Sequence, residues 1–210
     1  MRTSNVAQRA LIVTAHPDPQ SLTHAVAARV GEGIAAAGHA FDIADLAAEG
    51  FDPRFTPADI AVHLHLTDPP ADVAVEQARI DRADALVLAY PVYWWSMPAL
   101  LKGWIDRVFA NGWAYHYSEG TGVQKRLRGL PVHLLAIGGA DLRTYARHGY
   151  FGAMKTQIDH GIFDYCGARV LTSELLLGSE PEQAAAHLQL AQALGRRLFA
   201  ASDASVAAAA

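Results

Sequence analysis

Five short apolar runs recur along this sequence, separated by longer segments of mixed polarity. The runs are rich in Val, Ile, Leu and Ala, which is typical of strands buried on both faces of a sheet. They lie at residues 9–15, 40–44, 85–89, 131–137 and 169–177. Strands that alternate with helices favour a parallel sheet. The pattern therefore predicts an α/β fold, with one five-stranded parallel sheet and helices on both faces.

The segments between the runs carry helix signals. In the first of them, Ser21 is a suitable N-cap, apolar residues repeat every four positions behind it, and Gly38 can end the helix. Further helices are predicted at residues 72–82 (capped by Asp72), 98–109, 151–165 and 181–200. Residues 52–70 are interpreted as an excursion that contains a helical turn, and residues 112–129 as a long loop. No linker divides the chain, so a single domain is expected over 1–210, with flexible ends at about 1–8 and 203–210.

Composition narrows the classes of function. Hydrophobic residues make up 51% of the 210 residues and charged residues 18%, which excludes a disordered chain. A net charge of −4 gives no electrostatic basis for binding nucleic acid. No apolar run is long enough to span a bilayer, so membrane insertion is not expected. Cys166 is the only cysteine, which excludes an internal disulfide and suits a reducing cytoplasm.

The first strand is followed by a loop suited to an anion. His16 opens this loop, and Ser21, Leu22 and Thr23 follow where the next helix begins. Free amides and the helix dipole favour a phosphate at such a place, and two hydroxyl groups add donors. Helix capping is the alternative role of Ser21. No Gly-x-Gly-x-x-Gly or Gly-Lys-Ser/Thr sequence is present, which disfavours a Rossmann dinucleotide or a nucleoside triphosphate.

Two later strand ends carry further candidate residues. The segment Pro91-Val92-Tyr93-Trp94-Trp95 places three large aromatic side chains where a planar ring could stack. Gly138 and Gly139 follow the fourth strand and let backbone approach a ligand closely. Tyr145 and His148 come shortly after and could stabilise charge on a redox-active ring. In parallel sheets, ligands bind at the carboxyl ends of the strands, where these three loops are expected.

Other chemistries lack support in the sequence. His63 and His65 alternate as metal ligands on a strand could, but no carboxylate or cysteine is evidently paired with them. No metal site is therefore expected. A Gly-x-Ser-x-Gly elbow is absent, so a serine hydrolase is not indicated.

Taken together, these segments resemble the flavin-dependent NAD(P)H:quinone oxidoreductases of the DT-diaphorase type, over roughly residues 9–198. The resemblance is carried by Ala-Leu-Ile-Val-Thr-Ala-His at 10–16, Ser-Leu-Thr at 21–23, Ala-Asp-Ala-Leu-Val at 83–87, Pro-Val-Tyr-Trp-Trp at 91–95, Pro-Ala-Leu-Leu-Lys-Gly-Trp at 98–104, Asp-Arg-Val-Phe at 106–109, the double glycine at 138–139 and Tyr-Cys-Gly at 165–167. By this resemblance, the chain is expected to be shorter than the longest family members and to lack their C-terminal extension.

The resemblance implies a flavodoxin-like fold, a homodimer and FAD as cofactor, with FMN as the alternative. It implies that His16 and residues 21–23 meet the ribityl-phosphate side of the flavin, that residues 91–95 line its ring system, and that Gly138 and Gly139 contact its edge. Tyr145 falls one residue from the family's catalytic tyrosine. His148 is the histidine nearest to the family's histidine position, which Phe151 occupies.

The activity implied is two-electron, ping-pong hydride transfer from NADPH or NADH to a quinone-like acceptor. Two alternatives remain: a flavodoxin-like electron carrier, and an ancillary regulatory flavoprotein of a potassium-efflux system. Aromatic rather than acidic loops distinguish this sequence from a carrier. Four aromatic residues crowd the segment after the aromatic loop and indicate a dimer interface. They are Trp104, Trp113, Tyr115 and Tyr117.

Overall fold

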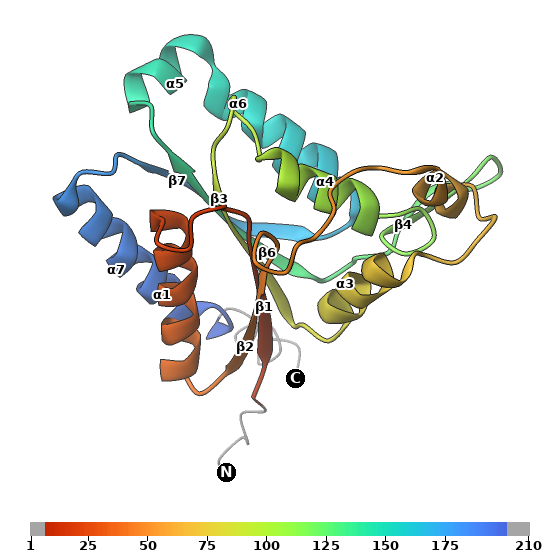
Figure 1. Ribbon diagram of the computed structural model, residues 1–210, viewed down its shortest axis with the longest axis horizontal. Coiled ribbons are helices and arrows are strands. Elements are labelled where there is room, and N and C mark those ends of the chain that lie inside the picture. Colours follow the sequence, from red (N-terminus) through yellow and green to blue (C-terminus); the bar gives the residue numbers. More distant parts are fainter. Residues whose placement is uncertain (1–6, 201–210) are drawn as a thin grey trace, which may run out of the picture.

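The computed structural model describes residues 7–200 and confirms a five-stranded parallel sheet (Figure 1). The strand order is β2-β1-β3-β6-β7, with every neighbouring pair parallel. The strands are β1 (Arg9–Thr14), β2 (Ala40–Asp45), β3 (Ala85–Pro91), β6 (Pro131–Gly138) and β7 (Arg169–Leu177). Each matches a predicted run to within two residues. Residues 1–6 and 203–210, where flexible ends were expected, lie outside the described residues, whereas Gln8 bonds to His39.

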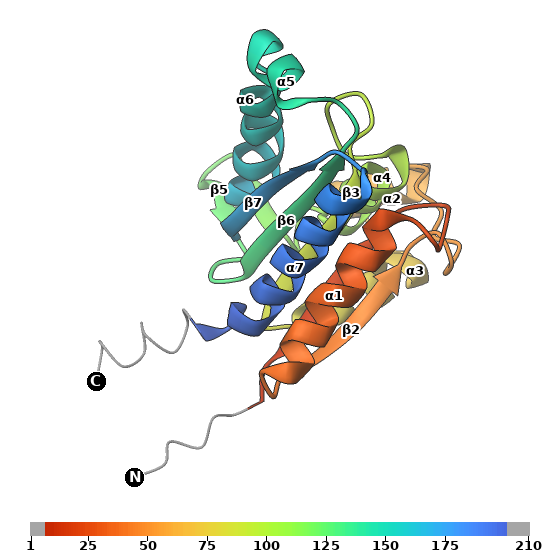
Figure 2. The ribbon, with the colours of Figure 1, turned by 90° about the vertical axis from the view of Figure 1, so that its left-hand side faces the viewer.

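Helices cover both faces of the sheet. On one face α1 (Leu22–Ala36) and α7 (Pro181–Arg197) lie side by side, as Figure 2 shows. The other elements lie on or beyond the opposite face (Figure 1). They are α2 (Pro57–His63), α3 (Ala71–Asp81), α4 (Ala99–Val108), α5 (Leu142–His148), α6 (Tyr150–Lys155), the π-helix η1 (Thr156–Asp164), and the hairpin strands β4 (Tyr115–Ser118) and β5 (Gly122–Lys125).

Each face of the sheet has its own apolar core. Alternate residues of β1 point to opposite faces, as expected for a strand. Leu11 and Val13 join the cluster beneath α4 and η1, whereas Ala10 and Ile12 join the cluster beneath α1 and α7. The helices α1 and α7 approach so closely that a methyl group on Gly195 would meet the backbone of α1. The sheet is therefore held from both sides, and its strand ends are fixed in position.

Three predicted segments differ from the structure. Residues 112–129, predicted as a loop, contain the β4–β5 hairpin. Helix α5 (Leu142–His148) lies in the segment predicted as a loop after Gly139, whereas the predicted helix at 151–165 is formed by two consecutive elements, α6 and the π-helix η1. Asp72 does not cap α3. Its carboxylate instead bonds the Arg107 guanidinium at 2.6 Å, because the first turn of α3 packs beside α4.

The excursion before α3 is ordered and is anchored by Arg107. Helix α2 begins with a capping box in which Thr56 and Asp59 bond each other's backbone. The buried Asp59 carboxylate accepts a second bond from Arg107 at 3.1 Å. Although burial favours the neutral acid, the hydrogen bonds from Thr56 and, after them, the ion pair with Arg107 hold the pKa of Asp59 below its ordinary value. Among residues 7–200, no helix is long and apolar enough to cross a membrane.

Candidate functional site

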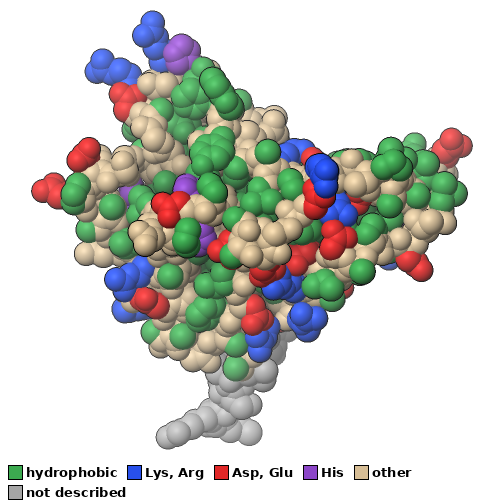
Figure 3. All heavy atoms as spheres, viewed as in Figure 1, with side chains coloured by type: hydrophobic (Ala, Val, Ile, Leu, Met, Phe, Trp, Pro, Cys, Tyr) green, Lys and Arg blue, Asp and Glu red, His purple; other side chains and the backbone are tan. Residues whose placement is uncertain are grey.

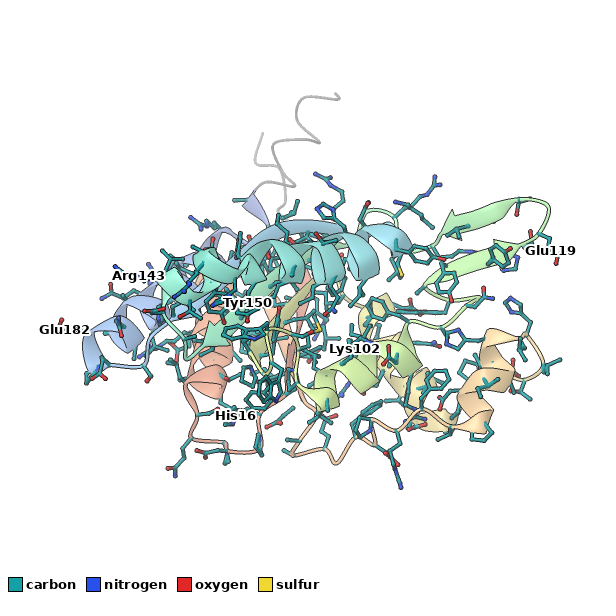
Figure 4. The ribbon with its side chains drawn as sticks, turned by 90° about the horizontal axis from the view of Figure 1, so that it is seen from above. His16, Lys102, Glu119, Arg143, Tyr150 and Glu182 are labelled. Atoms are coloured by element: carbon teal, nitrogen blue, oxygen red, sulfur yellow. The ribbon has the colours of Figure 1, made fainter. Side chains whose placement is uncertain are left out.

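The three loops predicted to bind a ligand follow β1, β3 and β6, which are neighbours in the sheet. Because the strands are parallel, all three loops leave the sheet at its carboxyl edge, where open α/β sheets bind ligands. Figure 4 views this edge from above, with His16 and Tyr150 labelled. The structure therefore brings the predicted loops to one edge of the molecule.

The loop after β3 is a tight two-residue turn with a tryptophan at each central position. Tyr93 and Ser96 exchange backbone hydrogen bonds of 3.1 Å, and between them Trp94 and Trp95 have φ values of +50° and +61°. Positive φ at both central residues is the arrangement of a type I′ turn, which normally selects Asn and Gly. Such strain at bulky residues is concentrated at functional sites.

The two tryptophans have different surroundings. Trp94 is 92% exposed, although a side chain as large and apolar as tryptophan is normally buried on folding. Trp95 lies stacked on Tyr150, with ring centroids 3.8 Å apart, and meets the Tyr145 ring edge-on at 5.2 Å. The hydroxyl of Ser96 donates to Gln157 on η1 at 2.6 Å, which fixes the turn to the helical layer. The turn thus presents one packed and one uncovered indole.

The loop after β6 places a phenol over the double glycine. Tyr145, on α5, is 1% exposed, and a methyl group added to Gly138 would come within 2.7 Å of its hydroxyl oxygen. Burial raises the pKa of Tyr145, so the phenol stays protonated and can donate. By contrast, a methyl group on Gly139 would meet no described atom within 4 Å. The backbone of Gly139 is therefore open to a ligand.

These two loops border a cleft of about 240 Å³ that is open to solvent. Its volume lies somewhat below the usual range of small-molecule sites, about 300–1,000 Å³, so a bound ring system would stay partly exposed. The cleft is lined by Val92, Trp94, Trp95, Gly139, Ala140 and Tyr145. All but Ala140 were predicted from the sequence. Pro91 ends β3 beneath the turn, Tyr93 is half-exposed at its start, and Gly138 ends β6.

The loop after β1 lies on the same edge but does not line this cleft. Its backbone is fixed locally: the Asp18 N–H donates to His16 at 3.0 Å, and the Ser21 N–H donates to the Asp18 carbonyl at 3.1 Å. Ser21 is the N-cap of α1, so its capping role is confirmed. Leu22 and Thr23 form the first turn of α1, with Thr23 buried. Near this loop, the buried Thr14 hydroxyl at the end of β1 has no hydrogen-bond partner among residues 7–200.

His148 lies apart from the cleft, exposed at the end of α5. Its ring stacks on Tyr150 at 5.2 Å, and Tyr150 in turn stacks on Trp95. Tyr150 is thus the nearer aromatic neighbour of the cleft, and sequence reasoning missed it. The run Tyr-Ala-Arg-His-Gly-Tyr from 145 to 150 contains a signal for this placement. Gly149, in the left-handed conformation, ends α5 and redirects the chain so that Tyr150 reaches Trp95.

Comparison with known sequences identifies the class of fold. The profile of the flavodoxin-like fold family matches residues 8–198 of this chain. The chain belongs to this family. The sheet order and the ligand-type loops at the carboxyl edge agree with that assignment.

Within this class, the chain is similar to quinone reductases. It is 31% identical to NAD(P)H dehydrogenase [quinone] 1 of Cavia porcellus, over 81% of this chain and 69% of that protein. It is 29% identical to ribosyldihydronicotinamide dehydrogenase [quinone] of Mus musculus, over 81% and 82% of the two chains. The structure of NAD(P)H:quinone oxidoreductase from Methanothermobacter marburgensis superposes with a TM-score of 0.84, at 29% identity, covering 92% of this chain and all of that one. The predicted fold class, family resemblance and enzyme class are confirmed.

Proposed function

We propose that this protein is an NAD(P)H dehydrogenase of the quinone-reducing kind, with a flavin bound at the carboxyl edge of the sheet. The observation that carries the proposal is the cleft in which the strained aromatic turn faces Gly139 and Tyr145. The similarity to named quinone reductases supports it. It also favours the enzyme over the electron carrier and the ancillary subunit of a potassium-efflux system.

The cleft fits the ring system of a flavin. Its lining combines the aromatic turn, the open backbone of Gly139 and the protonated phenol of Tyr145. The β1–α1 loop offers an N-capped helix end for a phosphate, with His16, Ser21, Leu22 and Thr23 as its contacts. A bound flavin would accept hydride from the nicotinamide and pass it to the acceptor, in two half-reactions.

The residues of this chain then have separate roles. Pro91 to Trp95 would hold the ring system, and Gly138 and Gly139 would contact its edge. The Tyr145 hydroxyl would donate to oxygen as negative charge develops there. His148 would act from outside the cleft through Tyr150, the ring against which it stacks. Exclusion of water falls to Trp94, whose exposed indole would cover a bound ring.

The finer assignments are also proposals. FAD is the cofactor we propose, as the family resemblance implies. FMN is the alternative, since general stress protein 14 of Treponema denticola, 27% identical with a TM-score of 0.59, is described in complex with FMN. NADPH and NADH are both candidate donors. Cys166, a buried free thiol whose pKa burial raises to about 11, fits the reducing cytoplasm that we propose as the location.

A homodimer remains part of the proposal, on a revised basis. Trp104 is fully buried, with its indole N–H donating to Glu76, so its assignment to an exposed interface was wrong. Exposed apolar side chains gather instead around α2 and the β4–β5 hairpin, at the right of Figure 3. They are Phe55, Ile60, Leu64, Leu66, Tyr117 and Val123. A second copy of the chain would cover this surface.

Purification followed by visible spectroscopy and mass determination of the released flavin tests the proposal. We expect a yellow protein with one flavin per chain that oxidises NAD(P)H in the presence of a quinone. A colourless protein that takes up neither FAD nor FMN refutes it. Light scattering of the flavin-loaded protein tests the dimer, and a monomer at micromolar concentration contradicts that part alone.

A further inference from the structure

His24 stands at the centre of a row of three hydrogen-bonded side chains beside the β1–α1 loop. Its Nδ1 lies 2.9 Å from the Ser21 hydroxyl, and its Nε2 lies 2.9 Å from the Asp45 carboxylate. Asp45 is the last residue of β2, and its other oxygen accepts backbone N–H groups from the turn that follows. The row therefore ties the N-cap of α1 to a fixed carboxylate on the neighbouring strand.

Two ionisable groups face the His24 ring. One is Asp45, and the other is His16, whose ring meets it edge-on at 6.3 Å. The side chains of His24 and Asp45 are only 16% and 23% exposed, so water screens them weakly. If Nε2 carried no proton, its lone pair would face the negatively charged Asp45 carboxylate, and the two would repel each other. The carboxylate therefore keeps a proton on Nε2 whether the ring is neutral or charged.

The charge on His24 then decides what the Ser21 hydroxyl can do. In the neutral ring Nδ1 is an acceptor, so the Ser21 O–H must donate to it, while its oxygen accepts the His24 backbone N–H at 3.3 Å. No proton is left on Ser21 for an anion. In the charged ring Nδ1–H donates to the Ser21 oxygen, which releases the hydroxyl proton toward the loop.

We propose that His24 is a positioning residue that couples binding of the cofactor's phosphate to the uptake of one proton. The inference rests on the proposed function, because it takes the β1–α1 loop as the phosphate site. Phosphate oxygens only accept hydrogen bonds, so they select the state in which Ser21 donates. That state carries the additional proton, drawn from solvent, on the His24 ring, and its charge attracts the phosphate.

The direction of the pH effect follows from linkage. Because a proton is taken up on binding, the affinity for a phosphate-bearing flavin rises as the pH falls. At full uptake it changes about tenfold per pH unit, since the two binding equilibria are reciprocal. Riboflavin carries no phosphate, so its affinity has no such dependence.

Calorimetric titration of the full-length chain freed of flavin measures the proton directly. FMN, FAD and riboflavin are titrated separately in two buffers of different ionisation enthalpy, above about pH 7, where the phosphate of FMN is already ionised. We expect an uptake of about one proton for FMN and FAD and none for riboflavin. Equal uptake by all three, or none by any, overturns the coupling. Failure of all three to bind overturns the proposed function itself and the coupling with it.

Asp45→Asn provides a sharper test. The amide donates to Nε2 and so reverses the tautomer, placing the neutral ring's only proton on Nδ1. Ser21 is then free to donate at any pH, so the variant should bind FMN without proton uptake. Asp42→Asn makes the same change on the same strand, at an exposed carboxylate paired with Arg9, and should leave the uptake intact. Uptake that persists in Asp45→Asn overturns the proposal.

The ring of His24 can also be observed in the unaltered chain, which removes any dependence on how the variants fold. Nitrogen NMR of the histidine side chains should show the Nε2–H tautomer without FMN and a doubly protonated ring with FMN, at the same pH. An unchanged His24 ring overturns the proposal.

Discussion

Replacement of Trp94 tests whether the aromatic turn sacrifices stability for binding. Trp94 has φ +50° and is 92% exposed, so its indole gains little from folding while its backbone is strained. We compare Trp94→Asn with Trp94→Leu. Both variants lose the indole, but only asparagine adopts the left-handed region readily. The pair therefore separates backbone strain from the loss of the ring.

The magnitude follows from burial and conformation. A tryptophan buries up to about 250 Å² on folding. The 8% of Trp94 that is covered therefore corresponds to about 20 Å², or about 0.5 kcal/mol at about 25 cal/mol per Å². The left-handed conformation costs a bulky residue about 1–2 kcal/mol. We expect Trp94→Asn to be about 1 kcal/mol more stable than Trp94→Leu, which corresponds to about 2–4 °C in Tm for a chain of this length.

Urea unfolding of the flavin-free proteins measures the difference, and flavin titration measures the binding. Both variants should lose flavin affinity by a similar factor of about five, since one ring contact contributes about 1 kcal/mol. A leucine variant as stable as the asparagine variant refutes the strain argument. Undiminished flavin affinity in both variants refutes the role of Trp94 in the site.

Three further outcomes are expected. Tyr145→Phe should slow flavin reduction in stopped flow by up to about 10²-fold with flavin affinity nearly unchanged, whereas Tyr165→Phe, outside the cleft, should not; an unchanged rate removes Tyr145 from the catalytic residues. Gly195→Ala should lower the free energy of unfolding by about 1–3 kcal/mol, because its methyl group meets the Val30 carbonyl. Gly152→Ala, a helical glycine with open space around it, should be neutral or stabilising, and equal effects would contradict the close contact of α1 and α7. Burial, with a smaller effect of Arg197, lowers the pKa of His133 to about 4. The unfolded chain therefore binds a proton at higher pH than the folded one. As the pH is lowered from about 6.5 to about 4, the free energy of unfolding should fall by about 1.4 kcal/mol per pH unit. Urea unfolding of His133→Gln should show a weaker pH dependence, and an unaltered one contradicts this assignment.

The five strands of the main sheet could be predicted because their burial determines which residue types they contain. A strand covered on both faces must be apolar throughout, so runs such as 85–89 stand out without any tertiary information. The hairpin of β4 and β5 has no such run. Its strands pair only with each other and stay half-exposed, so residues such as Gln124 and Lys125 give no strand signal. A helix was predicted over the residues of η1, but its π-type hydrogen bonding was not, because no residue type in that segment distinguishes a π-helix from an α-helix.

The site was predictable where side-chain chemistry is unusual, and not where it depends on pairing. Two adjacent tryptophans after a strand end mark a surface that packing alone does not explain. His24 and Asp45, by contrast, are ordinary residues 21 positions apart. Only the parallel pairing of β1 with β2 brings them together. Tyr150 was missed for a similar reason, because the turn at Gly149 decides where its ring points.

The contact between α1 and α7 joins the first and the last helix of residues 7–200, and this has a consequence for synthesis. As the polypeptide leaves the ribosome, β1, α1 and β2 emerge early, but the side of α1 that packs against α7 has no covering partner until α7 appears. The packing of α1 in this layer must therefore wait until residues 181–197 have been translated. Closure of so long a loop is slow, and the nascent chain exposes an aggregation-prone surface meanwhile. Removal of α7 would leave that surface permanently open, so this layer is completed only after residues 181–197 have been synthesised.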